Sequence, residues 1–216
     1  MIILIQGKQG SGKGTQAKML VEKYGLYFFS TGDLSRKLAK EDPRIDELIN
    51  VKGQLIPTEE MTVHVSKFLD EKFKGKPKDM LFDGYPRFVE QYKHLSKWLK
   101  DRGTKIDAVV MLEISDNEAI KRLSNRRLDP KTGKIYNFHT APKPGPEVDV
   151  KALVQRKDDM PSVIKGRLQE YEKNTLPMIQ LIKEEGNLVE VDGERPIDVI
   201  HKDIVNRIEK KLQNRQ

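Results

Sequence analysis

A glycine-rich segment near the N-terminus constrains this chain more than any other part of its sequence. The segment, Gly7 to Thr15, reads GKQGSGKGT and follows the isoleucine-rich run MIILIQ. Glycines let a backbone turn tightly and bring several N–H groups to one point, and a following helix adds the positive end of its dipole. Gly7, Gly12 and Lys13 have the spacing of a phosphate-binding P-loop, in which the lysine reaches the β- and γ-phosphates. The segment therefore predicts binding of a nucleoside triphosphate.

The residue after the lysine departs from the usual P-loop pattern. A hydroxyl normally stands directly after the lysine, where it reaches Mg²⁺. Here Gly14 occupies that position and Thr15 comes next, so Thr15 is the candidate for the hydroxyl. The competing interpretation is an ordinary glycine-rich turn, and the strand, loop and helix expected around the segment argue against it.

Charge and composition narrow the class of partner. Lys and Arg total 40 against 33 for Asp and Glu, a net charge of +7 in a chain of 216 residues. Such an excess suits nucleotide phosphates, a nucleic acid or simply a solvated basic surface, and charge alone does not choose. The absence of cysteine excludes disulfides and thiolate metal sites. No apolar run approaches the ~20 residues of a membrane span and no basic leader is present, so we expect a soluble, cytoplasmic protein with no membrane partner.

Apolar strands alternate with amphipathic helices along most of the chain. This order predicts an α/β fold, a parallel sheet covered by helices on both faces. Short oxygen-bearing side chains favour helix N-caps, which we expect at Thr31, Thr58 and Asp116. Expected strands cover residues 1–6, 26–30, 80–82, 108–114 and 188–191, and expected helices cover residues 13–24, 58–72, 88–102, 116–125, 160–185 and 196–212.

The alternation stops between residues 126 and 159. This stretch is rich in proline and glycine and has little helical periodicity. A loop of that length inside a compact domain is typical of either a functional or a disordered segment, and periodicity alone leaves both interpretations open.

Six segments together resemble the adenylate kinases, a family of nucleoside monophosphate kinases. They cover essentially the whole chain in the family's order, which is far more specific than any one segment. They are GKQGSGKGTQ with its displaced threonine, Ser30–Asp33 with Arg36, Phe82–Arg87 with Gln91, Asn125–Arg127 with Gly133–Tyr136, Arg156–Asp159 with Arg167, and Val191–Gly193.

The resemblance implies a P-loop NTPase fold with a five-stranded parallel sheet and two inserted parts. The core would comprise residues 1–125 and 160–216, a helical AMP-binding flap residues 30–72, and a LID residues 126–159. Two departures stand out. Gln9 takes the place of the family's usual proline, and the long LID lacks the four cysteines that bind zinc in some members.

The resemblance also implies a set of site residues. Phosphoryl transfer needs positioned cations rather than a nucleophilic side chain, and guanidinium groups bind phosphate with two donors. The implied catalytic residues are Lys13, Arg87, Arg126, Arg156 and Arg167. The implied ATP-binding residues are Gly10, Ser11, Gly12, Lys13, Gly14, Thr15, Arg122, Arg126, Ile135, Tyr136 and Arg195. The implied AMP-binding residues are Thr31, Gly32, Arg36, Gln54, Leu55, Ile56, Gly84, Tyr85, Arg87, Gln91, Arg156 and Arg167.

Thr15 and Asp83 are the candidate magnesium residues. Asp83 follows an apolar strand, at the end where ligands of parallel sheets bind, and it suits Mg²⁺ through water molecules. Asp33 is a weaker second candidate. Taken alone, Asp83 also fits a turn aspartate, Gln91 an exposed helix residue, and each arginine an ordinary surface residue.

The implied activity is reversible, Mg²⁺-dependent phosphoryl transfer from ATP to AMP that gives two ADP. The LID and the flap would close over the nucleotides and exclude water. The partners would be ATP, AMP and ADP, with no zinc and no nucleic acid, and the chain would be a monomer.

The sequence leaves three alternatives open. The nearest is a kinase for another nucleoside monophosphate, UMP/CMP or GMP, against which the long LID and the amide of Gln91 favour AMP. A basic nucleic-acid-binding protein with an incidental P-loop lacks support, since the chain has no zinc finger, RNP motif or dense basic stretch. A catalytically silent nucleotide sensor is disfavoured because every expected cation is present.

Overall fold

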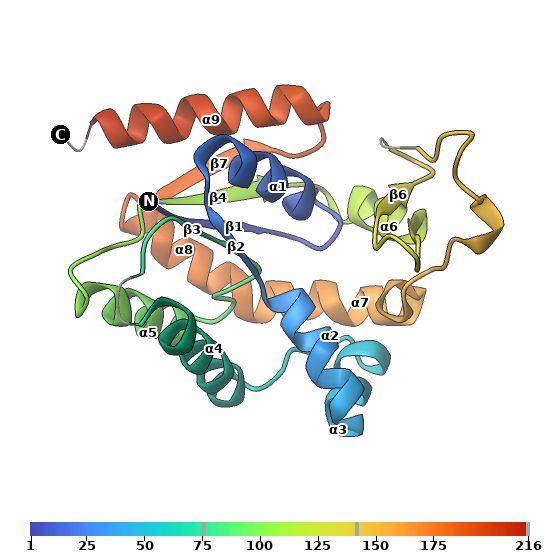
Figure 1. Cartoon of the computed structure of the whole chain (residues 1–216), viewed down its shortest axis with the longest axis horizontal. Helices are drawn as coiled ribbons and strands as arrows, with labels where there is room; N and C mark the ends of the chain where they lie inside the picture. The colour runs from blue at the N-terminus through green and yellow to red at the C-terminus, as the bar shows by residue number, and fades with distance from the viewer. Residues whose placement is uncertain (75–76, 141–142, 215–216) are drawn as a thin grey trace.

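The computed structural model describes residues 1–74, 77–140 and 143–214, and its centre is a five-stranded parallel sheet (Figure 1). The strand order is β2-β3-β1-β4-β7, so the strand that leads into the P-loop lies in the middle. All six residues of that strand are buried, which fits its isoleucine-rich sequence. The predicted fold class is therefore confirmed. The strands are β1 (Ile2–Gly7), β2 (Tyr27–Ser30), β3 (Met80–Asp83), β4 (Ala108–Glu113) and β7 (Leu188–Asp192).

Helices cover both faces of the sheet. Alternate residues of β1 point to opposite faces, so Ile3 and Ile5 pack with α1 and α9, while Ile2 and Leu4 pack with α4, α5 and α8 (Figure 1). The helices are α1 (Lys13–Tyr24), α2 (Thr31–Glu41), α3 (Pro43–Asp46), α4 (Thr58–Phe73), α5 (Val89–Lys100), α6 (Asp116–Ser124), α7 (Pro161–Glu170), α8 (Leu176–Glu184) and α9 (Ile197–Gln213). Within the described ranges, none of these helices has the length and apolar character needed to cross a bilayer.

The long helix expected over residues 160–185 is interrupted. A π-helical turn, Tyr171–Thr175, joins α7 to α8, and its side chains Tyr171 and Thr175 are buried. A second π-helical turn, Glu47–Val51, follows α3. The sequence predicts neither turn, because single π-helical turns inside helices are rare and have no residue type that marks them.

The three predicted N-caps are each wrong by one residue. Ser30 caps α2, because its side chain accepts from the Asp33 N–H at 3.3 Å, and Ser115 caps α6 in the same way. Thr31 is the first helical residue, and its hydroxyl donates to the Gly84 carbonyl at 2.6 Å. Thr58 follows Pro57, which provides no side-chain cap. Each predicted cap thus lies inside its helix.

Segment 126–159 contains a small antiparallel hairpin, β5 (Arg126–Leu128) with β6 (Ile135–Asn137), and short 3₁₀ turns; residues 141–142 lie outside the described part. The side chain of Asn137 forms hydrogen bonds that hold the hairpin in place. Its Nδ2 donates to the Arg122 carbonyl at 2.8 Å, and its Oδ1 accepts from the backbone N–H groups of His139 and Thr140. A buried amide therefore ties the hairpin to α6.

Asn137→Ala is expected to loosen this hairpin. The substitution removes the partners of three backbone groups, and unsatisfied buried groups cost about 1–3 kcal/mol. Hydrogen exchange measured by mass spectrometry should show about tenfold faster exchange in β5 and β6. Asn174→Ala, which removes one bond on a partly exposed helix surface, is the control. Equal exchange rates in wild type and Asn137→Ala would contradict this role.

Candidate active site

The loop between β1 and α1 folds around its own lysine. Gly7, Gly10 and Gly12 have φ values of +140°, +84° and +93°, which side chains other than glycine rarely adopt. The Nζ of Lys13 donates to the carbonyls of Gly7 and Lys8, both at 2.7 Å. The P-loop predicted from glycine spacing is thus a compact turn closed by Lys13.

Lys13 lies among one carboxylate and several arginines. Burial, together with the nearby cations Arg87, Arg167 and Arg126, lowers the pKa of Lys13 to about 7, although Asp83 opposes the shift. Asp83 is the last residue of β3, the strand paired with β1. Burial raises the pKa of Asp83, and the positive charges of Lys13 and Arg87 act against this increase. Cations held this close together favour the entry of a polyanion.

A cavity lies beside this loop, between α2, the segment after α3 and the end of β3. Among the described residues, every predicted AMP-side residue except Arg156 lines it. The sequence-predicted lining residues are Thr31, Gly32, Arg36, Gln54, Leu55, Ile56, Gly84, Tyr85, Arg87, Gln91 and Arg167. The lining residues that sequence reasoning did not assign to the site are Gln9, Ser35, Ile49, Gly53, Met61, Phe88 and Asp158.

Hydrogen bonds hold the turn after β3 in one shape. The Arg87 Nε donates to the Gly84 carbonyl at 2.7 Å, and the Arg87 N–H donates to Gln91 Oε1 at 2.9 Å. Gln6, buried on the central strand, donates to the Pro86 carbonyl at 3.0 Å. The amide of Gln91 therefore orients Arg87 through its oxygen, a role that the sequence did not predict.

Two neighbouring aspartates pair with the arginines beyond the cavity. Asp159, fully buried, accepts from Arg126 Nε at 2.7 Å and Nη2 at 2.6 Å. The Asp158 carboxylate forms an ion pair with Arg167 Nη1 at 2.9 Å, and the Asp158 carbonyl accepts from the same nitrogen. Arg167, Arg126 and Arg156 keep the pKa of Asp158 low against its burial. Burial and neighbouring arginines lower the pKa values of Arg156 and Arg167 to about 10. Guanidinium groups and carboxylates from distant parts of the chain thus form one network.

A family model described as adenylate kinase matches residues 5–187. This chain belongs to the adenylate kinase family. It is 39% identical over 206 residues to the adenylate kinase of Pyrococcus furiosus, covering 93% of this chain and 92% of the relative. It is 37% identical over 211 residues to the adenylate kinase of Fusobacterium nucleatum, covering 94% of this chain and 95% of the relative. It is 34% identical over 212 residues to the adenylate kinase of Petrotoga mobilis, covering 95% of this chain and 96% of the relative.

The remaining residues predicted for the ATP side lie outside this cavity. Arg122 joins α6 to two loops, because its guanidinium donates to the Gly193 carbonyl at 2.9 Å and to the Gly10 carbonyl at 3.5 Å. It also pairs with Glu118 on its own helix at 2.7 Å. Arg195 pairs with Asp203 at 2.6 Å. Of the hairpin residues, Ile135 is exposed and Tyr136 is buried. The donors of both arginines are therefore largely engaged within the protein.

Gln9, the departure from the family's usual proline, faces the cavity. Its side chain is part of the cavity wall, and its Oε1 is buried with no hydrogen-bond partner among the described residues. The neighbouring loop glycines keep their left-handed conformations, so the substitution leaves the P-loop turn intact. Gln9 therefore belongs both to the P-loop and to the cavity wall.

Oxygen ligands suited to Mg²⁺ lie at the start of α1. A Cβ added at Gly14 would lie 3.9 Å from Asp83 Oδ2, so the carboxylate faces the helix start, which also carries the exposed Thr15. Carboxylate and hydroxyl oxygens are the donors that Mg²⁺ prefers. No cluster of three His, Asp or Glu side chains able to hold a metal occurs in the described ranges.

Asp159→Asn is expected to destabilise the protein without ligand. Removing one partner of a buried ion pair leaves uncompensated charge and costs about 3 kcal/mol. Thermal unfolding should show a lower Tm for the variant, and saturating ATP should raise that Tm more than it raises the wild-type Tm, because phosphates replace the missing negative charge. Asp198→Asn on the exposed start of α9 is the control. A wild-type Tm for Asp159→Asn would overturn this account.

Proposed function

We propose that this protein transfers the terminal phosphoryl group of ATP to AMP, reversibly and with Mg²⁺, and so forms two ADP. The observation that carries the proposal is that the P-loop and the neighbouring cavity share one group of cations. Lys13 closes the P-loop, and the same lysine lies within electrostatic reach of Arg87 and Arg167, which line the neighbouring cavity. A donor on the loop and an acceptor in the cavity would meet there.

In this proposal the protein positions the two nucleotides and neutralises their charge. A phosphate oxygen of AMP attacks the γ-phosphorus of ATP, the bond from that phosphorus to the β–γ bridging oxygen breaks, and ADP leaves. Arg36 and Arg87 hold the acceptor phosphate, and Arg156 and Arg167 span the transferring group. Residues 10–15 with Arg126 bind the ATP phosphates, and Arg122, Ile135, Tyr136 and Arg195 lie on its nucleoside side.

The acceptor base would occupy the end of the cavity formed by the flap. Thr31, Gly84 and residues 54–56 line that part, and Gln91 is buried at its edge. Because Gln91 Oε1 already accepts from the Arg87 N–H, its Nε2 remains the group to meet the base edge. Gln91 would thereby couple base recognition to the position of the phosphate-binding arginine.

Thr15 and Asp83 would hold Mg²⁺, Asp83 through water. The bound ion would neutralise phosphate charge and orient the triphosphate. Residues 126–159 would close as the LID and residues 30–72 as the AMP flap over a core of residues 1–125 and 160–216, which would exclude water as phosphoryl acceptor. A cytoplasmic location and a monomeric state remain predictions from the sequence.

The choice of monophosphate is tested by an ADP-forming assay with ATP and Mg²⁺. We expect kcat/KM for AMP to exceed the values for UMP, CMP and GMP by about 100-fold, because buried polar groups discriminate strongly against a base that leaves them unpaired. Equal or better turnover of UMP, CMP or GMP would favour the neighbouring kinase class. No ADP formation with any monophosphate would refute the proposed function.

Arg87→Ala is expected to lower kcat by about 10²–10³-fold, the usual loss on removing one donor to transition-state charge. Circular dichroism and Tm should show a folded protein. Arg207→Ala, which removes an exposed guanidinium paired with Asp203, should keep wild-type kinetics. Near-normal turnover by Arg87→Ala would exclude Arg87 from the reaction.

A further inference from the structure

Two glycines allow the flap to touch the long helix backbone to backbone. Gly53 lies in the turn that follows Glu47–Val51 and leads into residues 54–56, and Gly166 lies in the middle of α7, one residue before Arg167. In Figure 1 the cyan helical turn that follows α3, residues 47–51, lies next to α7. The two glycines stand where these parts of the chain meet.

The contact leaves no space for a side chain on either partner. A Cβ on Gly166 would lie 2.5 Å from the Lys52 carbonyl oxygen and 3.6 Å from Gly53 Cα. A Cβ on Gly53 would lie 2.5 Å from the Val163 carbonyl oxygen and 3.1 Å from the Arg167 nitrogen. Real Cβ atoms essentially never approach within 3.0 Å, and backbone atoms have no rotamer by which to move away.

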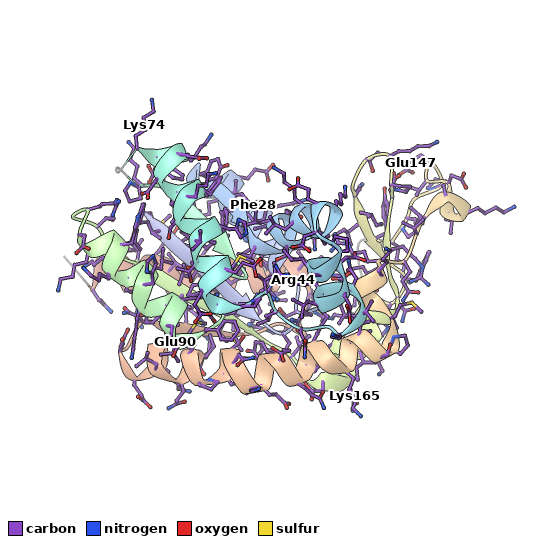
Figure 2. The ribbon with its side chains drawn as sticks, turned by 90° about the horizontal axis from the view of Figure 1, so that it is seen from below. Phe28, Arg44, Lys74, Glu90, Glu147 and Lys165 are labelled. Carbon is purple, nitrogen blue, oxygen red and sulfur yellow. The ribbon has the colours of Figure 1, made fainter. Side chains whose placement is uncertain are left out.

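The backbone conformation explains only one of the two glycines. Gly53 has φ +67°, which by itself favours glycine, whereas Gly166 is an ordinary helical residue. Glycine inside a helix is less stable than alanine. Lys165, its neighbour, points outward from the same helix (Figure 2), so α7 has room for side chains elsewhere. The close contact with Lys52 is therefore the structural reason for glycine at position 166.

The contact connects both halves of the acceptor cavity. Gly53 leads directly into Gln54, Leu55 and Ile56, and Gly166 leads directly into Arg167, and all four of these neighbours line the cavity. We infer that Gly166 is a positioning residue for the monophosphate acceptor: it admits the Lys52–Gly53 backbone onto α7 and so sets the distance between the flap's base-binding residues and Arg167. The inference rests on the proposed function.

Gly166→Ala tests it by adding a single methyl group. The methyl group forces the flap away from α7, so KM for AMP should rise at least tenfold while KM for ATP stays within twofold. Alanine favours the helix by up to about 1 kcal/mol, which offsets the cost of displacing the flap, so Tm should change little. A merely structural role would lower Tm and leave the ratio of the two KM values unchanged. Lys165→Ala on the exposed side is the matched control and should keep both KM values.

A second measurement does not depend on catalysis. The chain has no cysteine, so spin labels can be placed on Val51→Cys in the flap and Gln180→Cys on α8, both exposed. Electron–electron double resonance should show a longer or broader distance distribution when Gly166→Ala is added. An unchanged distribution, or a KM for AMP within twofold of wild type, overturns the inference. Wild-type inactivity towards AMP would refute the proposed function, while a changed distribution would still support the docking contact.

Discussion

The site depends above all on the concentration of buried positive charge around Lys13. Arg87 lowers the pKa of both Lys13 and Arg167, in addition to the effect of their burial. Like charges held together away from water raise the free energy of the folded state. Asp83, Asp158 and Asp159 offset part of this repulsion. The remainder favours a polyanion with several phosphates, so one arrangement accounts for both affinity and charge stabilisation during transfer.

The sheet makes this concentration of charge tolerable. Parallel pairing of β1 with β3 brings the P-loop and Asp83 to the same edge, where the carboxyl ends of the strands meet. The two apolar clusters on either face fix these strands rigidly. The side chain of Gln6, on the central strand, also fixes the turn after β3 by donating a hydrogen bond to the Pro86 carbonyl. Hydrophobic burial thus supports a polar site that is unfavourable by itself.

Local patterns predicted more of this structure than distant contacts did. The strands, the P-loop and the cavity residues after β3 follow from patterns whose members are neighbours in the chain. The predicted cap of α2 was displaced by one residue because Thr31 and Ser30 both carry a hydroxyl, and only the Gly84 carbonyl, to which Thr31 donates, decides between them. The pairing of Arg126 with Asp159 joins positions 33 residues apart, and the need for Gly166 arises from Lys52. Spacing within the chain contains no signal for such contacts.

Two kinds of contact therefore surround Arg167, and they respond differently to a nucleotide. Its pairing with Asp158 is electrostatic, so an arriving phosphate competes for the same guanidinium. Its backbone packs directly against Gly53, and this steric contact between backbone atoms does not depend on charge. The position of the arginine is consequently fixed by sterics while its charge remains available. In the proposed reaction, the arginine would thus keep its position while its guanidinium exchanges Asp158 for a phosphate.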